Sequence, residues 1–257
     1  MIQNTEENKF TEFVNIVRRL RRECPWDREQ THESLRRCLL EETYEVLESI
    51  DNNDIEELKK ELGDILLQVI FHSVIGEETK SFSLEDVISS ETKKLTERHP
   101  HIFGNVKVSG SEEVKTNWEK LKRKEGRVSV LDGVPHELPA LFKAYRIQEK
   151  AAKVGFDWKE VKPIYEKILE EVGELRHNIE SGAEQDKIED ELGDVLFSIV
   201  NYARFLKINP EDALRKTIKK FTSRFQKIET HAKSIGKSPE EMTLEEMDEV
   251  WNRVKEK

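Results

Sequence analysis

Eight acidic residues of the 257-residue chain fall into two sets of four with nearly the same spacing. The first set is Glu42, Glu45, Glu61 and Asp64, and the second set is Glu171, Glu174, Glu191 and Asp194. Each set consists of two pairs whose members are three residues apart, so the members of a pair project from one side of a helix. Clustered carboxylates of this kind suit hard divalent cations such as Mg²⁺. The chain therefore predicts two cation sites.

Turn-forming residues lie almost midway between the two pairs of each set. They are the Asp-Asn-Asn-Asp run at 51–54 in the first set and Ser-Gly-Ala at 181–183 in the second. A chain reversal at these points places the flanking helices antiparallel and brings the two pairs of acids level. We therefore expect one acidic metal site on an antiparallel helix pair in each half of the chain.

The acids interrupt apolar stretches, which places them beside a hydrophobic core. Leu39, Leu40 and Tyr44 surround the first pair, and a largely apolar run at 65–70 follows the second. Carboxylates near a core are costly unless they are paired or bind a metal. A single Glu-x-x-Glu in a chain that is 37% charged is usually a solvated helix face. Its repetition with similar neighbours favours the metal site.

Other landmarks recur in the same order after each acid set. Lys94, Arg98, Trp118 and Lys122 of the first half correspond to Lys220, Arg224, Trp251 and Lys255 of the second. Self-similarity over this length predicts two copies of one structural unit. We expect an N-terminal repeat at residues 1–125 and a C-terminal repeat at 139–257, joined by a linker at 126–138 that contains glycine and proline.

Composition indicates an all-α fold. Glu, Lys, Leu and Arg dominate, apolar residues recur at intervals of three and four, and convincing strand-like alternation is missing. Gly63 and Gly193 interrupt the expected helices at a cost of about 1 kcal/mol each relative to alanine. We expect close helix packing beside the acids to compensate for that cost.

The same composition limits location and partners. The formal net charge of −10 disfavours binding to a nucleic-acid polymer, and no apolar run approaches the ~20 residues that cross a bilayer. The first ten residues contain two glutamates and lack the apolar segment of a secretory signal. The only two cysteines fit no zinc-site pattern. We expect a cytoplasmic protein with free thiols and no membrane attachment.

Several motifs together resemble the MazG family. They are Cys24-Pro25-Trp26-Asp27, Leu40-Glu41-Glu42-Thr43-Tyr44-Glu45, Glu61-Leu62-Gly63-Asp64, Arg98-His99-Pro100-His101 and Val154-Gly155-Phe156-Asp157-Trp158. The resemblance covers essentially the whole chain, and the joint pattern is far more specific than any one fragment.

The resemblance implies an all-α nucleoside triphosphate pyrophosphohydrolase that forms a monophosphate and pyrophosphate with Mg²⁺, for which Mn²⁺ could substitute. It implies that all eight acids bind metal and that Glu171, Glu174, Glu42 and Glu45 are catalytic. In this hypothesis, metal ions bridge the triphosphate and a carboxylate-held water attacks the α-phosphorus. The family's association with clearing aberrant or excess nucleotides implies broad specificity and a housecleaning role.

The resemblance also gives the recurring cations a role, because a triphosphate carries more negative charge than the metal ions balance. We expect substrate contacts from Lys94, Arg98, Lys122, Lys220, Arg224 and Lys255, and from Trp118 and Trp251 if they are not core residues. The second repeat has Lys187 four residues before Glu191 and Asn201 seven residues after Asp194. The first repeat has Glu57 and Phe71 there. The second site is therefore better furnished for phosphate, and we expect it to be the main hydrolase.

Two other functions remain open. The chain could be a non-enzymatic helical scaffold, or a relative restricted to a single nucleotide such as dUTP. A di-iron bundle is disfavoured because it needs Glu-x-x-His on two helices around one core, whereas Glu174-x-x-His177 is matched by Glu45-x-x-Glu48. Apolar faces left on such small helical units also predict a homodimer.

Overall fold

The computed structural model describes residues 3–111, 113–114, 117–118, 121 and 129–255. Every regular element in these ranges is a helix, which confirms the expected all-α class. None of the described helices is long and apolar enough to cross a membrane. The chain divides into two compact units, Met1–Lys122 and Arg123–Lys257.

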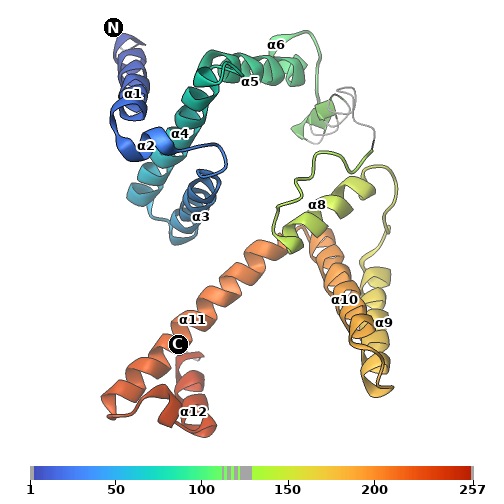
Figure 1. Ribbon diagram of the computed structural model, residues 1–257. Helices are drawn as coiled ribbons and strands as arrows, with labels where there is room; N and C mark the ends of the chain where they lie inside the picture. The colour runs from blue at the N-terminus through green and yellow to red at the C-terminus, as the bar shows by residue number, and fades with distance from the viewer. Residues whose placement is uncertain (1–2, 112, 115–116, 119–120, 122–128, 256–257) are drawn as a thin grey trace. The chain divides into compact units, whose positions relative to one another are not determined.

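The N-terminal unit is built around helix α4 (Figure 1). Its described helices are α1 (Gln3–Glu23), α2 (Pro25–Glu29), α3 (Arg36–Asn52), α4 (Ile55–Glu78), α5 (Leu84–Arg98) and α6 (Pro100–Phe103). Asn53 ends α3 in the left-handed conformation, with φ 54°. Asp54 then begins α4, because its side chain accepts a hydrogen bond from the backbone amide of Glu57 at 3.0 Å. The chain therefore turns between α3 and α4 where the sequence predicts a turn.

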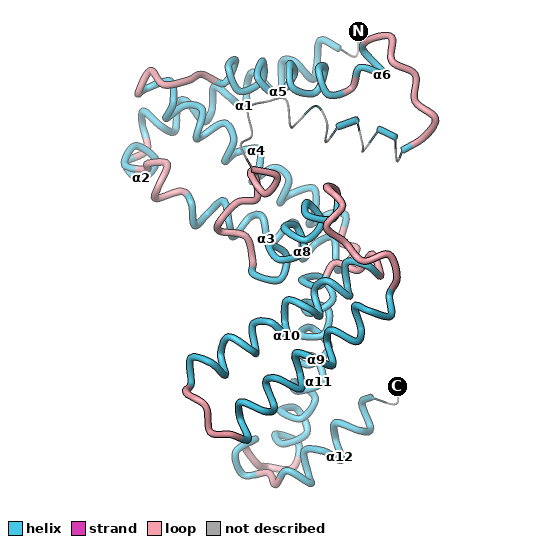
Figure 2. Tube along the Cα trace, turned by 90° about the vertical axis from the view of Figure 1, so that its right-hand side faces the viewer, coloured by secondary structure: helices cyan, strands magenta, loops and turns pink. Residues whose placement is uncertain are grey.

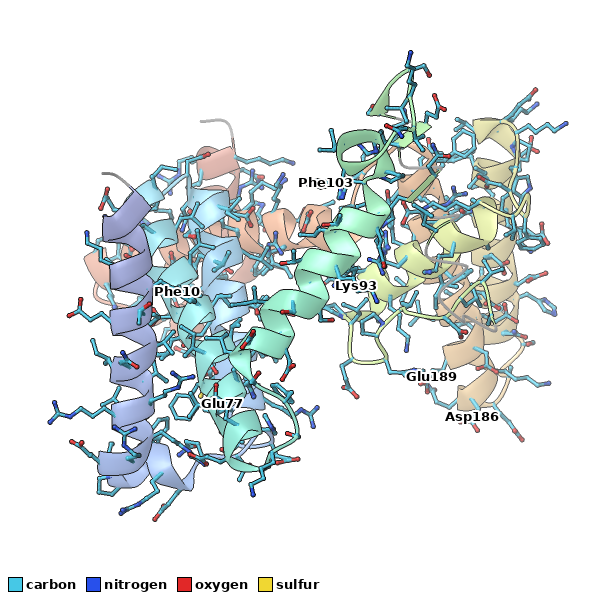
Figure 3. The ribbon with its side chains drawn as sticks, turned by 90° about the horizontal axis from the view of Figure 1, so that it is seen from above. Phe10, Glu77, Lys93, Phe103, Asp186 and Glu189 are labelled. Carbon is cyan, nitrogen blue, oxygen red and sulfur yellow. The ribbon has the colours of Figure 1, made fainter. Side chains whose placement is uncertain are left out.

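A hydrophobic core fills the space between α1, the start of α3 and α4. Its buried side chains are Val14, Val17, Leu35, Ile70, Phe71, Val74 and Ile75. Arg21 lies beside this core, with Nε 3.0 Å from Glu78 Oε1 and the guanidinium 5.9 Å from the centre of the Phe71 ring. Glu77, labelled in Figure 3, pairs with Arg18 at 2.8 Å. These contacts join α1 firmly to α4.

The C-terminal unit contains a second pair of consecutive helices followed by a long helix. Its elements are α8 (Ala140–Ala152), α9 (Val161–Glu180), α10 (Gln185–Phe205), α11 (Pro210–Ser234), the 3₁₀ helix η1 (Pro239–Glu241) and α12 (Leu244–Lys255). Helices α9 and α10 lie side by side and are joined by a short turn (Figures 1 and 2). Helix α10 also packs against α8, and α11 packs against α8 and α12.

Packing in the C-terminal unit is uneven. Ile228 and Ala232 of α11 form a buried core with Met242 and Val250. Between α8, α9 and α10, in contrast, the side chains leave a cavity of about 510 Å³. The cavity lies in the same part of the unit as the second acid set.

The predicted linker at 126–138 is described from residue 129 onward, and residues 126–128 lie outside the described chain. Lys150 of α8 is 5% exposed and donates a hydrogen bond to the carbonyl oxygen of Asp132 at 3.0 Å. This part of the segment is therefore held against the first helix of the C-terminal unit.

The glycines beside the acids are not sites of close packing inside the units. A Cβ added at Gly63 or Gly193 meets no atom within 4 Å. The expectation that helix packing within each unit compensates for these glycines is therefore wrong. Both positions lie on exposed faces of their helices.

Candidate active site

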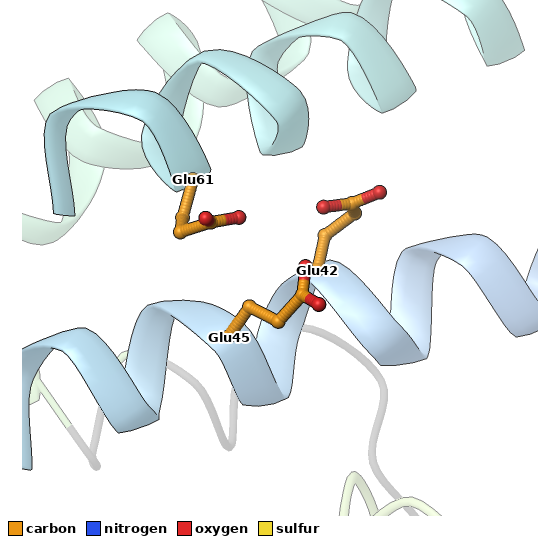
Figure 4. A group of neighbouring side chains, drawn as sticks. All are labelled: Glu42, Glu45 and Glu61. Carbon is orange, nitrogen blue, oxygen red and sulfur yellow. The ribbon is translucent and has the colours of Figure 1, made fainter. Parts of the chain in front are cut away.

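Helices α3 and α4 bring the first acid set together. Glu42 and Glu45 project from α3 and Glu61 from α4, and one carboxylate oxygen of each lies within 4.8 Å of the others (Figure 4). Asp64 lies one helical turn after Glu61. Burial, followed by repulsion from Asp64 and Glu45, raises the pKa of Glu42. Burial is also the main cause that raises the pKa of Glu61, which is 8% exposed.

Helices α9 and α10 form the equivalent cluster in the C-terminal unit. Glu171 of α9 and Glu191 and Asp194 of α10 each place one carboxylate oxygen within 4.8 Å of the others. Burial, followed by repulsion from Glu171 and Glu191, raises the pKa of Glu174. Asn178 donates a hydrogen bond to Glu191 Oε1 at 3.0 Å. Glu174 therefore lies outside the tight group but close enough to Glu171 and Glu191 to be affected by their charges.

The donor set decides which cation each cluster could hold. Each tight group offers three carboxylates and no nitrogen or sulfur donor. Oxygen-only sets suit Mg²⁺ or Mn²⁺ and do not suit the softer transition metals. A divalent cation among the oxygens would also offset their mutual repulsion. The residues present therefore fit a hard divalent cation.

Lys167 is a neighbour of the second cluster that the sequence analysis does not single out. Its Nζ lies 2.8 Å from Glu171 Oε1 and 2.8 Å from Glu170 Oε1. Hydrogen bonds with Glu170 and Glu171 raise the pKa of Lys167, so this side chain stays positively charged. A lysine four residues before a glutamate is common on solvated helices, and the pattern alone gave no signal. The first repeat has Cys38 at this position.

The second acid cluster opens into the cavity between α8, α9 and α10. Glu171, Asp194 and Lys167 are among the residues that line it. Most of the remaining wall is apolar and includes Ile147, Phe156, Trp158, Ile164 and Phe197. One space therefore combines a carboxylate end with apolar and aromatic walls.

The equivalent region of the N-terminal unit is packed core. Seven residues after Asp64, Phe71 occupies the position that Asn201 has after Asp194. Phe71 is 4% exposed, and Leu35 beside it is 2% exposed. The two acid clusters thus resemble each other, whereas the space next to them differs.

The recurring cations and tryptophans form clusters of their own. The guanidinium of Arg98 lies 5.6 Å from the centre of the Trp118 ring, and that of Arg224 lies 5.4 Å from the centre of the Trp251 ring. Helix α12, which carries Trp251 and Lys255, packs against α11 and not against α9 or α10 in the described chain. Within the described C-terminal unit, these residues are therefore not brought to the second acid cluster.

Of the other described residues predicted to contact the substrate, one lines the cavity and the rest do not. Lys94 pairs with Glu91 on its own helix α5, and α5 packs against α4 and α6 but not against α3 in the described chain. Lys187 and Lys220 are exposed. Asn201 is 7% exposed and lines the cavity. Lys122 lies outside the described residues.

A two-unit helical protein with an oxygen-donor cluster beside an apolar cavity has the features of a metal-dependent enzyme for a phosphorylated compound. The chain matches the MazG nucleotide pyrophosphohydrolase domain twice, at residues 30–103 and 159–228, and belongs to this family. Each matched segment contains one complete acid set. The match confirms the resemblance, the tandem arrangement of two MazG units and the expected enzyme class.

Relatives of known sequence share both units. A Thermotoga maritima protein named nucleoside triphosphate pyrophosphohydrolase/pyrophosphatase MazG is 45% identical over 251 residues, which are 96% of this chain and 95% of that protein. An Escherichia coli nucleoside triphosphate pyrophosphohydrolase is 40% identical over 256 residues, 96% of this chain and 97% of that one. The uncharacterized Bacillus subtilis protein YabN is 46% identical over 97% of this chain, which corresponds to 52% of its own length.

Addition of a divalent cation to the metal-free protein is expected to raise its stability at pH 7, and to raise it much less at pH 4. The raised pKa of Glu42 means that its protonated form contributes stability below the unfolded pKa, and that this contribution is lost as the pH rises through the folded pKa. Above that pH, a cation can take the place of the proton. At 100 times its dissociation constant a ligand adds about 2.7 kcal/mol. Thermal denaturation with and without Mn²⁺ at both pH values measures the effect.

The control for this measurement is the double variant Glu42→Gln/Glu171→Gln, which should lose most of the cation-dependent shift. Equal stabilisation of the wild-type protein at pH 4 and pH 7, or an unchanged shift in the double variant, would show that the cation binds elsewhere.

Proposed function

We propose that the C-terminal unit hydrolyses nucleoside triphosphates to the monophosphate and pyrophosphate, with Mg²⁺ held by its four clustered acids. The observation that carries this proposal is that Glu171 and Asp194 belong both to the carboxylate cluster and to the cavity wall. A phosphate chain suits the carboxylate end through a divalent cation, and a nucleoside suits the apolar walls. The cavity volume of about 510 Å³ is within the range of roughly 300–1,000 Å³ for small-molecule sites.

The names of the Thermotoga maritima and Escherichia coli relatives describe the same reaction and support the proposal. We propose broad base specificity and a role in clearing nucleotides, because the wall of the cavity is mostly apolar and offers few groups that could reject a base. An enzyme restricted to dUTP is the competing hypothesis, and competition between nucleotides for turnover separates the two.

The chemistry follows from the bonds that change. A water oxygen bonds to the α-phosphorus, the bond between that phosphorus and the bridging oxygen breaks, and pyrophosphate leaves. Bound Mg²⁺ would supply charge neutralisation for the phosphates and lower the pKa of the attacking water. We assign the water's proton to a carboxylate oxygen of Glu174, the acid of this set that lies outside the tight group of Glu171, Glu191 and Asp194. Lys167 keeps a positive charge at the acid end of the cavity.

A second activity is proposed for the N-terminal unit, namely hydrolysis of inorganic pyrophosphate. The observation that favours it is the packed core beside the first cluster, where Phe71 and Leu35 fill the region that is a cavity in the other unit. A cluster without a nucleoside cavity suits a phosphate chain alone. The name of the Thermotoga maritima relative includes pyrophosphatase, which supports this assignment.

We also propose that the protein is a homodimer. Exposed apolar residues lie along three helices of the C-terminal unit: Tyr165, Leu169 and Val172 of α9, Leu192, Leu196 and Ile199 of α10, and Leu214, Ile218, Phe221 and Phe225 of α11. Gly173 and Gly193 leave open space on α9 and α10, which would allow another helix to approach closely. A second copy of the chain would remove these faces from water.

Substitution of Glu171 by glutamine is expected to reduce monophosphate formation from nucleoside triphosphates at least about 100-fold, because one charged group of the cluster is lost where transition-state charge develops. Glu42→Gln should leave the rate within about twofold. Product analysis that resolves monophosphate, diphosphate and pyrophosphate is the measurement.

The matched control is Glu170→Gln, since Glu170 is adjacent to Glu171 but lies outside the cluster. Loss of monophosphate in Glu42→Gln alone would place the reaction in the N-terminal unit. Formation of diphosphate and phosphate would show that water attacks a phosphorus other than the α-phosphorus. A wild-type protein without turnover would favour the scaffold hypothesis.

The pyrophosphatase hypothesis predicts the opposite dependence. With pyrophosphate and Mg²⁺, Glu42→Gln should lower phosphate release at least about tenfold, again because a cluster charge is lost, while Glu171→Gln should have little effect. Glu41→Gln is the control, because Glu41 is exposed and pairs with Arg37. The hypothesis is wrong if wild-type protein releases no phosphate, or if the loss follows Glu171 instead.

The dimer proposal predicts a solution mass near twice 30.2 kDa, measured by light scattering during gel filtration. Leu214→Glu/Ile218→Glu should shift the protein toward the monomer, because two carboxylates would be buried without partners at the interface. Lys216→Glu on the same helix should not. A monodisperse wild-type monomer would contradict the proposal.

A further inference from the structure

The cavity contains a polar group that the hydrolytic chemistry does not use. Asn201 of α10 is 7% exposed and lines the cavity together with Arg204 and Asp157. Arg204 donates to Asn201 Oδ1 from Nε at 3.0 Å and from Nη2 at 2.9 Å. The same guanidinium donates from Nη1 to Asp157 Oδ2 at 3.0 Å. Arg204 therefore bridges α10 and the loop that precedes α9.

This network fixes the orientation of the asparagine amide. A guanidinium can only donate hydrogen bonds, so Asn201 must turn its Oδ1 toward Arg204 and its Nδ2 away from it. Among the described residues, the Asn201 side chain makes hydrogen bonds with Arg204 alone, both at Oδ1, so its Nδ2 has no acceptor among them. The group that Asn201 offers to the cavity is therefore an N–H donor.

The position of Asn201 favours a nucleobase over a phosphate as its partner. Asn201 is seven residues after Asp194 on α10, which is roughly 10 Å along the helix at 1.5 Å per residue. The wall of the cavity that contains this network includes Ile147, Ala151 and Phe156. The one positive charge of the network, on Arg204, is already paired with Asp157. A mostly apolar wall with a neutral amide donor suits the flat, weakly polar base of a nucleotide.

We propose that Arg204 is a positioning residue that orients Asn201 to donate a hydrogen bond to the nucleobase, at a keto oxygen or a ring nitrogen. The proposal rests on the nucleoside triphosphate substrate proposed for this unit. Through Asp157, the same arginine holds the loop whose aromatic residues Phe156 and Trp158 line the cavity, where either ring could stack on a base. Asn201 thereby moves from the phosphate role that the sequence indicated to a role in base recognition.

The N-terminal unit has no counterpart of this hydrogen-bond network at the equivalent positions. Ten residues after Asp64 it has Val74 in place of Arg204, and Phe71 in place of Asn201. Both are buried in the core of that unit. The network therefore accompanies the cavity and not the acid cluster as such, which agrees with a role toward the nucleoside.

The test compares a substrate that has a base with a probe that has none. Arg204→Met is expected to raise KM for GTP about tenfold while kcat changes less than about threefold, because an oriented hydrogen bond is lost from ground-state binding. The inhibition constant of inorganic triphosphate should stay unchanged. Arg204→Lys, which keeps a donor for Oδ1, should recover most of the lost affinity. Arg176→Met removes an exposed arginine of α9 and is the control.

A second variant removes the donor without removing the arginine. Asn201→Asp replaces Nδ2 by an acceptor of similar size and keeps the partner of Arg204, so the unit should stay folded while GTP binding weakens. If the binding of GTP and of inorganic triphosphate weakened equally, or if neither changed, the proposal would be overturned.

Binding of guanosine without metal separates this proposal from the reaction itself. If wild-type protein hydrolyses no nucleotide, the proposed function is wrong, and guanosine binding still decides the role of Arg204. Weaker binding by Arg204→Met and Asn201→Asp than by wild type would support base recognition. Equal binding by all three proteins, or no binding by wild type, would rule it out.

Discussion

Repulsion among carboxylates on neighbouring helices is the constraint on which the rest of each unit depends. Glu42, Glu45 and Glu61 meet within 4.8 Å in one unit, and Glu171, Glu191 and Asp194 do so in the other. Two helices that carry such groups would separate unless other contacts held them together. The turn between the helices and the apolar residues beside the acids provide those contacts. The repulsion is therefore retained in the folded chain, where a hard divalent cation can relieve it.

The two acid clusters differ in what surrounds them. In the N-terminal unit the region between α1, α3 and α4 is filled by core side chains, and Arg21 is tied to Glu78 beside Phe71. In the C-terminal unit the corresponding region is a cavity that reaches the acids. A filled region gives stability through packing, whereas an open one gives room for a ligand. The N-terminal unit is thus stabilised by packing in this region, whereas the C-terminal unit has the open space in which we propose that a nucleoside binds.

The sequence predicted those features that depend on spacing along one or two helices. Residues three apart share a helix face, and a turn midway between two pairs brings them level. The approach of the acids within each set and the all-α class could therefore be predicted. The cavity could not be read, because it depends on which side chains of α8, α9 and α10 fail to fill the space between them. Lys167 gave no signal because its pattern is common on solvated helices. The glycine interpretation failed because Gly63 and Gly193 face outward and not toward a helix of their own unit.

The arginines of the two units show how similar chemistry can serve different ends. Arg21 and Arg204 are both largely buried and both pair with a carboxylate. Arg21 joins two helices beside a filled core, and its other hydrogen bonds go to the backbone carbonyl oxygens of Asp27 and Gln30. Arg204 donates to the Oδ1 end of the Asn201 amide, and this fixes Nδ2 as the end that the amide presents to the cavity. A buried ion pair is weak evidence for stability by itself, and the presence of Asn201 gives the Arg204 pair a directional consequence that the Arg21 pair lacks.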